Sequence, residues 1–174
     1  MDSLLTHLNH WRSFRALVVG DFMLDQLLYG DAERLSADAP VPILHVRRQE
    51  DRAGGAANVC LDLDALKGHV EAVGVIGDDA FGLALRRALL ERKIGITGLV
   101  VDQSRPTTVK QNLIGLAQQR HPQKMFRVDY ESRDALEPTI VEELLARVER
   151  LLPSVDVVCI EDYAKGVCTP ELCQ

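Results

Sequence analysis

Four short apolar runs, separated by helical patterns, constrain the fold of this chain more than any other feature. Residues 16–20, 70–76, 96–101 and 155–160 form these runs, which are rich in Val and Ile. Strands that are apolar throughout are typical of a parallel sheet buried on both faces. We therefore predict an α/β fold with a doubly wound, mainly parallel sheet, in which residues 155–160 form the last buried strand.

Helices are predicted between and around these strands, because apolar residues recur there at spacings of three and four. Gly54 and Gly55 open one of them, and Asp78 or Asp79 is expected to cap another. Pro138 is expected to begin the helix before the last strand. The predicted helices cover approximately residues 3–11, 54–68, 79–92 and 138–148.

A second group of strands is predicted outside this alternation. Residues 40–50 alternate apolar and polar side chains, and the prolines at their start confine them to an edge or a small separate sheet. Residues 107–116 and 124–130 are expected to pair across a polar turn at 118–123. The segment between Asp21 and Pro40, which contains Gly30, is expected to be a loop.

Composition excludes several classes of function. The 174 residues make about one domain, with 47% hydrophobic and 26% charged residues, as in ordinary globular proteins. Acidic residues outnumber basic ones by 26 to 20 and the basic residues do not cluster, so we expect no nucleic-acid partner. No apolar stretch approaches membrane-spanning length and no signal peptide is evident, so we expect no membrane partner and a cytoplasmic location.

The four cysteines show no C-x-x-C pair, and we expect them to be reduced thiols and not metal ligands. They are Cys60, Cys159, Cys168 and Cys173. The sequence predicts no metal-ligating residues.

Three polar clusters lie where predicted strands end, which is where open parallel sheets bind ligands, and the segment from Ala53 to Asn58 is one of them. Asp21 and Asp25 follow the first strand, and their carboxylates can accept hydrogen bonds from the hydroxyls of a polyol. The alternative is that Asp21 only caps the following turn. Asp162, Tyr163 and Lys165 follow the last strand, where a capping turn is again the alternative.

Two further groups are candidates for ligand contact. Gly54 and Gly55 at a helix start allow close approach of a ligand to backbone N–H groups, with Asn58 one turn on. A tight turn before a closely packed helix is the alternative, and the pattern is neither G-x-G-x-x-G nor a Walker loop. Side chains on the predicted strand pair can bind a phosphate group or form a solvated face. They are Thr107, Lys110 and Arg127.

Six motifs occur in an order that resembles a known family. They are V-V-G-D-F-M-L-D, A-P-V-P, G-G-A-A-N-V, G-D-D-A-F-G, P-T-T-V-K and E-D-Y-A-K-G. From Arg15 onward the chain resembles ribokinase-like, phosphofructokinase B-type carbohydrate kinases. Among these it is most similar to the kinase domain that acts on D-glycero-β-D-manno-heptose 7-phosphate, which is often fused to an ADP-heptose synthase domain.

The resemblance implies an activity and a site. The activity is ATP-dependent phosphoryl transfer with Mg²⁺ to the anomeric hydroxyl of heptose 7-phosphate, on the route to ADP-heptose and lipopolysaccharide core. The segment near 33–52 would belong to a small β lid that covers the sugar and forms a homodimer contact. Residues implied to bind the sugar or its phosphate are Asp21, Asp25, Gly54, Gly55, Asn58, Thr107, Lys110, Arg127, Asp162, Tyr163 and Lys165.

Motifs of the family's second half do not occur in this sequence. The G-A-G-D motif, whose Asp takes the acceptor proton, and the N-x-x-E motif tied to magnesium are both missing. Residues 1–174 therefore resemble the N-terminal, sugar-binding half of a kinase that is truncated before its nucleotide-binding half, and no catalytic residue is assigned. Glu161 stands where the family has serine. Alternative functions are a non-catalytic sugar-phosphate-binding fragment and a kinase for another sugar.

Overall fold

The computed structural model describes residues 6, 10–116 and 121–173. Most of the helix predicted over residues 3–11 and part of the turn predicted over 118–123 lie outside the described residues. Within the described part of the chain, no helix is long and apolar enough to cross a membrane.

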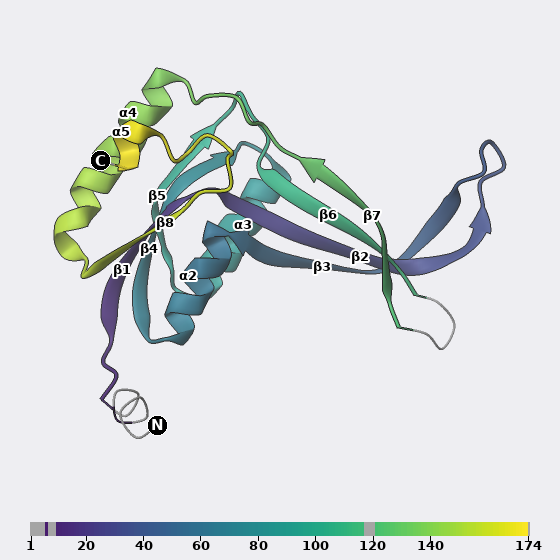
Figure 1. Ribbon diagram of the computed structural model, residues 1–174, viewed down its shortest axis with the longest axis horizontal. Helices are drawn as coiled ribbons and strands as arrows, with labels where there is room; N and C mark the ends of the chain where they lie inside the picture. The colour runs from purple at the N-terminus through teal and green to yellow at the C-terminus, as the bar shows by residue number, and fades with distance from the viewer. Residues whose placement is uncertain (1–5, 7–9, 117–120, 174) are drawn as a thin grey trace.

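Sheet A is the parallel sheet that the sequence predicts, and its four strands lie in the order β5-β4-β1-β8. Helices cover both of its faces (Figure 1). One core cluster joins the sheet to α2 and α3, and a second cluster joins the opposite face to α4. The predicted doubly wound α/β arrangement is therefore confirmed. The strands are β1 (Phe14–Gly20), β4 (Gly68–Gly77), β5 (Gly95–Asp102) and β8 (Val157–Glu161).

The helices begin near the residues that the sequence indicates. Gly55 is the N-cap of α2, Asp79 caps α3 by accepting a hydrogen bond from the N–H of Gly82, and Pro138 is the first residue of α4. A single turn, α5, closes the described chain. The bounds are α2 (Ala56–Ala65), α3 (Ala80–Glu91), α4 (Pro138–Leu151), the 3₁₀ turn η1 (Leu152–Ser154) and α5 (Pro170–Cys173).

Sheet B projects away from sheet A (Figure 1) and has the strand order β3-β2-β6-β7. Strand β2 pairs antiparallel with β3 and parallel with β6, and β6 pairs antiparallel with β7. Residues 33–52, the expected lid segment, form the end of β2, its connection to β3 and most of β3. The strands are β2 (Phe22–Leu35), β3 (Pro42–Gly55), β6 (Thr108–Gly115) and β7 (Gln123–Tyr130).

The prediction of a loop between Asp21 and Pro40 is wrong, because residues Phe22–Leu35 form the 14-residue strand β2. Gly30 suggested a turn, but it lies inside the strand where β3 passes closely. A Cβ atom at Gly30 would lie 2.4 Å from the carbonyl oxygen of His45. Glycine at this position therefore reflects a close approach of two strands.

The prediction that the last strand is buried is also wrong. Strand β8 lies at the edge of sheet A and, among the described strands, pairs only with β1. Val158 and Ile160 are 39% and 49% exposed. No described element covers their outer side, so an apolar strand edge faces solvent.

Candidate functional site

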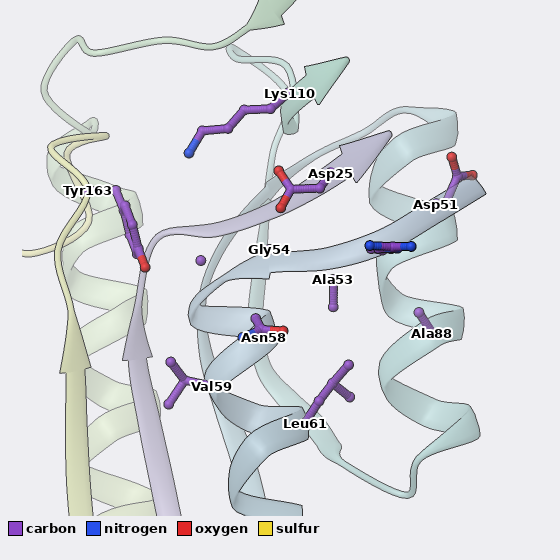
Figure 2. A pocket seen from close by; sticks show the side chains of 12 residues that line it. Asp25, Asp51, Ala53, Gly54, Asn58, Val59, Leu61, Ala88, Lys110 and Tyr163 are labelled. Atoms are coloured by element: carbon purple, nitrogen blue, oxygen red, sulfur yellow. The ribbon is translucent and has the colours of Figure 1, made fainter. Parts of the chain in front are cut away.

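A pocket of about 690 Å³ lies along the inner end of β3, beside the start of α2 and the loop after β8 (Figure 2). It brings together six of the side chains and glycines that the sequence singled out, from four helices and strands and the loop after β8. These six are Asp25, Gly54, Gly55, Asn58, Lys110 and Tyr163. The other lining residues are Asp51, Arg52, Ala53, Val59, Leu61 and Ala88.

Asp25 is the carboxylate at the centre of the polar wall. It lies on β2 in register with Lys110 of β6, and it accepts no hydrogen bond from the described residues. Gly54 lies beside it, because a Cβ atom there would be 2.8 Å from Oδ2 of Asp25. Because glycine has no side chain, Gly54 allows the Asp25 carboxylate to keep this position and to remain open to hydroxyl donors.

Gly55 turns the chain from β3 into α2. Its φ of 54° lies in the left-handed region, and a Cβ atom would lie 2.6 Å from the carbonyl oxygen of Asp21. The N–H of Ala56, the first residue of α2, donates to the carbonyl oxygen of Asp21 at 3.1 Å, and no side chain caps the N–H groups that follow it in the first turn. Asn58 follows one turn on, exposed, with its amide nitrogen donating to Asp62 at 3.0 Å.

The Lys110 side chain points towards the ring of Tyr163 (Figure 2). The Lys110 ammonium lies 5.4 Å from the centroid of the Tyr163 ring, within reach of a cation–π contact. Tyr163 is held by its backbone N–H, which donates to Oδ2 of Asp21 at 2.7 Å. The cation and the ring therefore form one side of the site.

Asp21 does not line the pocket, contrary to expectation. It is 2% exposed, and its carboxylate accepts backbone N–H groups of Tyr163 (2.7 Å), Lys165 (3.1 Å) and Val167 (3.4 Å). Asp21 therefore accepts backbone N–H groups, as the capping alternative expects. The segment that it holds is the loop after β8, which is distant in sequence, and not the turn that directly follows Asp21. Asp21 thus positions Tyr163, and its oxygens are used by the backbone.

Thr107 is buried away from the pocket, so its expected ligand contact is not supported. Its hydroxyl accepts the N–H of Gly77 at 2.9 Å, and its own N–H donates to Asp79 at 2.8 Å. Burial tends to raise the pKa of Asp79, but hydrogen bonds from Gly82 and Thr107 outweigh it, and the net pKa is lowered. Thr107 therefore ties the start of β6 to the end of β4.

Three further expected residues are occupied elsewhere. Lys165 is buried, and its Nζ lies 2.7 Å from Oε2 of Glu131. The guanidinium of Arg127 pairs with both oxygens of Asp129, at 2.8 and 2.9 Å, outside the pocket. Asp162 accepts the N–H of Ala164 in the turn after β8. These three residues lie close to pocket residues in the sequence or in sheet B, but none of the three lines the pocket.

Arg52 and Asp51 line the pocket although sequence reasoning did not single them out. The strand predicted over 40–50 continues to Gly55, which places Arg52 beside Asp25. The signal in the sequence was that both residues come shortly before Gly54. The register between β2 and β3 was needed to show that Arg52 lies beside Asp25.

The titratable groups outside the pocket give no metal centre. Among the residues that the structure describes, no three His, Cys, Asp or Glu side chains converge. All four cysteines are free. Burial raises the pKa of the Cys168 thiol to about 12 and also raises the pKa of Cys60, so both thiols stay protonated at neutral pH.

The structure is that of an α/β protein with a parallel sheet, a projecting second sheet and a polar pocket beside the start of α2. The family of pfkB carbohydrate kinases matches residues 14–161. The chain therefore belongs to the pfkB family of carbohydrate kinases.

Individual relatives agree with this family. A D-beta-D-heptose 7-phosphate kinase of Bordetella bronchiseptica is 43% identical over 153 residues, which span 88% of this chain and 46% of that protein. The bifunctional protein HldE of Geobacter sulfurreducens is 41% identical over 176 residues, which span 99% of this chain and 34% of that protein. The chain thus spans half or less of the length of these curated relatives.

A solved structure supports the fold. The chain superimposes on a carbohydrate kinase from Agrobacterium tumefaciens with a TM-score of 0.57 and 15% identity, over 84% of this chain and 45% of that one. At this identity the likeness concerns the fold alone. It confirms the expected ribokinase-like architecture, of which this chain has one part.

Proposed function

We propose that this chain is the sugar-binding part of a kinase that transfers a phosphoryl group from ATP to a sugar hydroxyl. The observation that carries the proposal is the Asp25 carboxylate, open to the pocket beside Gly54 and the first turn of α2. A carboxylate accepts hydrogen bonds from two neighbouring hydroxyls, and N–H groups of the helix start supply donors for sugar oxygens. Membership of the carbohydrate kinase family supports this assignment.

The substrate that we propose is D-glycero-β-D-manno-heptose 7-phosphate, phosphorylated at its anomeric hydroxyl towards ADP-heptose and lipopolysaccharide core. Its support is the 43% identity to a protein named D-beta-D-heptose 7-phosphate kinase. The cations Lys110 and Arg52 at the pocket suit a phosphorylated sugar. Cytoplasmic location is part of the proposal, because ATP use and four free thiols fit a reducing compartment.

The described residues do not fit a site for ATP and Mg²⁺. No acidic cluster converges among them, whereas Mg²⁺ is usually held by carboxylates together with substrate phosphates. We propose that further sequence of the kind that the longer relatives possess holds the nucleotide, the metal ion and the catalytic base. The role of this chain's own residues is to bind and orient the sugar.

We also propose that sheet B, acting as a lid, forms a homodimer contact. Leu28, Leu113 and Phe126 are neighbours in register on β2, β6 and β7, so they share one face of the sheet. Phe126 is 68% exposed, and no described element covers it. An isologous contact through this face would bury the apolar row.

Titration calorimetry with heptose 7-phosphate tests the proposed ligand on the chain itself. We expect binding by the wild type and at least roughly tenfold weaker binding by Asp25→Asn, because the variant loses a charged acceptor. Asp31→Asn, on the same strand but paired with Arg47, is the matched control and should bind as the wild type does. No heat change with the wild type would contradict the proposal.

A second candidate is a non-catalytic protein that binds a sugar phosphate, favoured by the carboxylate and the two cations at the pocket, Asp25, Arg52 and Lys110, which suit binding by themselves. Both candidates predict binding, so a phosphorylation assay must separate them. The chain is mixed with ATP, Mg²⁺ and heptose 7-phosphate, alone and joined to the C-terminal half of that relative. Product only in the joined protein supports the kinase proposal, and no product in either supports the binding protein. Ribose and fructose serve as competing acceptors that test for a kinase of another sugar.

A further inference from the structure

We propose that Arg52 is the residue by which this pocket recognises the phosphate of a phosphorylated sugar, and so selects it over the free sugar. This inference rests on the proposed function, because it assigns a role within the same site. Arg52 lies on β3 in register with Asp25, which is in turn in register with Lys110 of β6. Three charged side chains, cation, carboxylate and cation, therefore cross three neighbouring strands in one row.

The row has the dimensions of a sugar phosphate. Neighbouring strands are about 4.8 Å apart, so the two cationic positions lie roughly 10 Å apart on either side of Asp25. Hydroxyls hydrogen-bonded to Asp25 would place the two ends of the sugar towards Lys110 and towards Arg52. One of these two cations is then the partner of a terminal phosphate.

Lys110 is the weaker candidate for this partner. Its ammonium is directed at the ring of Tyr163, 5.4 Å from the centroid. Arg127, the arginine expected from sequence, is held by both oxygens of Asp129 and does not line the pocket. Arg52 is the cation at the pocket that neither faces an aromatic ring nor is held by two carboxylate oxygens.

The guanidinium of Arg52 retains donors for a ligand. Its Nε and Nη2 both contact the same oxygen, Oε1 of Glu50, at 2.7 Å. The pair is exposed, with 57% of the Arg52 side chain accessible, and exposed ion pairs are weak. The N–H groups of Nη1 donate to no acceptor among the described residues, and the planar fork suits two phosphate oxygens at once.

Arg48 provides a matched control on the same strand. It lies four residues before Arg52 on the same face of β3, and it contacts the other oxygen of Glu50 at 3.4 Å. Its guanidinium stacks over the ring of Tyr29, 4.1 Å from the centroid, and it does not line the pocket. Replacing either arginine removes the same charge from the same surface, but only Arg52 borders the site.

The experiment measures affinity for two ligands, heptose 7-phosphate and unphosphorylated heptose, by titration calorimetry of the full chain. We expect Arg52→Gln to weaken binding of the phosphate ligand roughly tenfold or more and binding of free heptose less than about twofold. Arg48→Gln should change either affinity less than about twofold. Arg52→Lys keeps the charge without the fork, so its affinity for heptose 7-phosphate should be intermediate.

Each contrary result overturns the inference in a recognisable way. Unchanged phosphate affinity in Arg52→Gln places the phosphate elsewhere, and equal weakening of both ligands gives Arg52 a role in the shape of the pocket. Equal effects of Arg48→Gln and Arg52→Gln would show that the ligand responds to the overall positive charge of the sheet and not to a contact with Arg52. If the wild type binds neither ligand, the proposed function itself fails and the inference with it. Should Arg52→Gln not fold, Arg52→Lys decides between these outcomes.

Discussion

At the residue scale, Asp21 and Asp25 have different roles although they are only four residues apart in the sequence. Asp21 ends the turn after β1, and its carboxylate points into the loop after β8, where three backbone N–H groups use it. Asp25 lies within β2 and points into the pocket. One carboxylate therefore holds the site's loop and the other is open to ligand.

Substitution of each aspartate by asparagine should separate these roles. Asp21→Asn replaces Oδ2, which accepts two N–H groups, by an amide that donates, so we expect a loss of about 1–3 kcal/mol in the free energy of unfolding. Asp25→Asn should change that free energy by less than about 0.5 kcal/mol while weakening sugar binding. Urea denaturation measures both. Equal stability of the two variants would contradict the assignment.

Gly54 should matter to binding more than to folding. A Cβ atom in Gly54→Ala would meet Oδ2 of Asp25 at 2.8 Å and displace the carboxylate. We expect binding of heptose 7-phosphate to weaken roughly tenfold, about 1.4 kcal/mol, in titration calorimetry. Gly115→Ala is the control, because the close contacts of its Cβ are with the flexible side chain of Met125, and its binding should match the wild type.

At the scale of elements, the loop after β8 is fastened from two sides. Asp21 holds it from β1, and Arg105, after β5, donates to the carbonyl of Lys165 at 3.1 Å. Arg105 also donates to the carbonyl of Asp134 and pairs with Asp102 at 3.0 Å. Because the pocket's Tyr163 lies on this loop, the connections between elements set the position of one wall of the site.

The ion pair between Glu131 and Lys165 belongs to the same loop and predicts a pH dependence. The hydrogen bond from Lys165 holds the pKa of Glu131 below its ordinary value of 4.5. At acidic pH the unfolded chain therefore binds more protons than the folded one. The stabilisation is complete above that ordinary value and is lost as pH falls through the lowered pKa of the folded state.

Urea unfolding at a series of pH values between about 3 and 7 checks this expectation. The free energy of unfolding should fall below about pH 4.5, and Glu131→Gln should make that part of the profile flatter. Glu149→Gln, an exposed carboxylate on α4, is the control and should keep the wild-type slope. A wild-type slope in Glu131→Gln would show that other carboxylates carry the effect.

At the scale of the whole molecule, two apolar surfaces are uncovered by any described element. One is the free edge of β8 with Val158 and Ile160, and the other is the face of sheet B with Phe126. Free strand edges and contiguous apolar patches promote association between chains. Self-association through both surfaces is therefore expected of this chain on its own, together with no measurable kinase activity.

Light scattering coupled to size exclusion tests that expectation and separates the two surfaces. Phe126→Glu should remove a dimer that forms through sheet B, whereas Val158→Lys should reduce larger assemblies that form through the edge of β8. Neither residue lines the pocket, so sugar binding should persist in both. A wild-type chain that elutes as a monodisperse monomer would contradict the expected self-association.

The elements that local sequence predicts well are those whose pattern is complete within one segment. Strands β1, β4 and β5 and helices α2, α3 and α4 each carry a continuous apolar run or a helical spacing, and the structure confirms them. Strand β2 was missed because Gly30 and several charged residues interrupt its pattern. Its stability comes from pairing with β3 and β6, which lie elsewhere in the sequence.

The residues of the candidate site show the same division between what the local sequence predicts and what contacts with distant segments decide. The sequence alone determined the α/β class, the family resemblance and the polar residues that gather near strand ends, because these depend on residue type and spacing. Tertiary structure decided which of them reach a ligand: Asp25, Lys110 and Tyr163 line the pocket, whereas Asp21 and Thr107 satisfy buried backbone groups. A carboxylate or hydroxyl has the same pattern in either role, and only the position of distant backbone N–H groups determines whether its oxygens remain open.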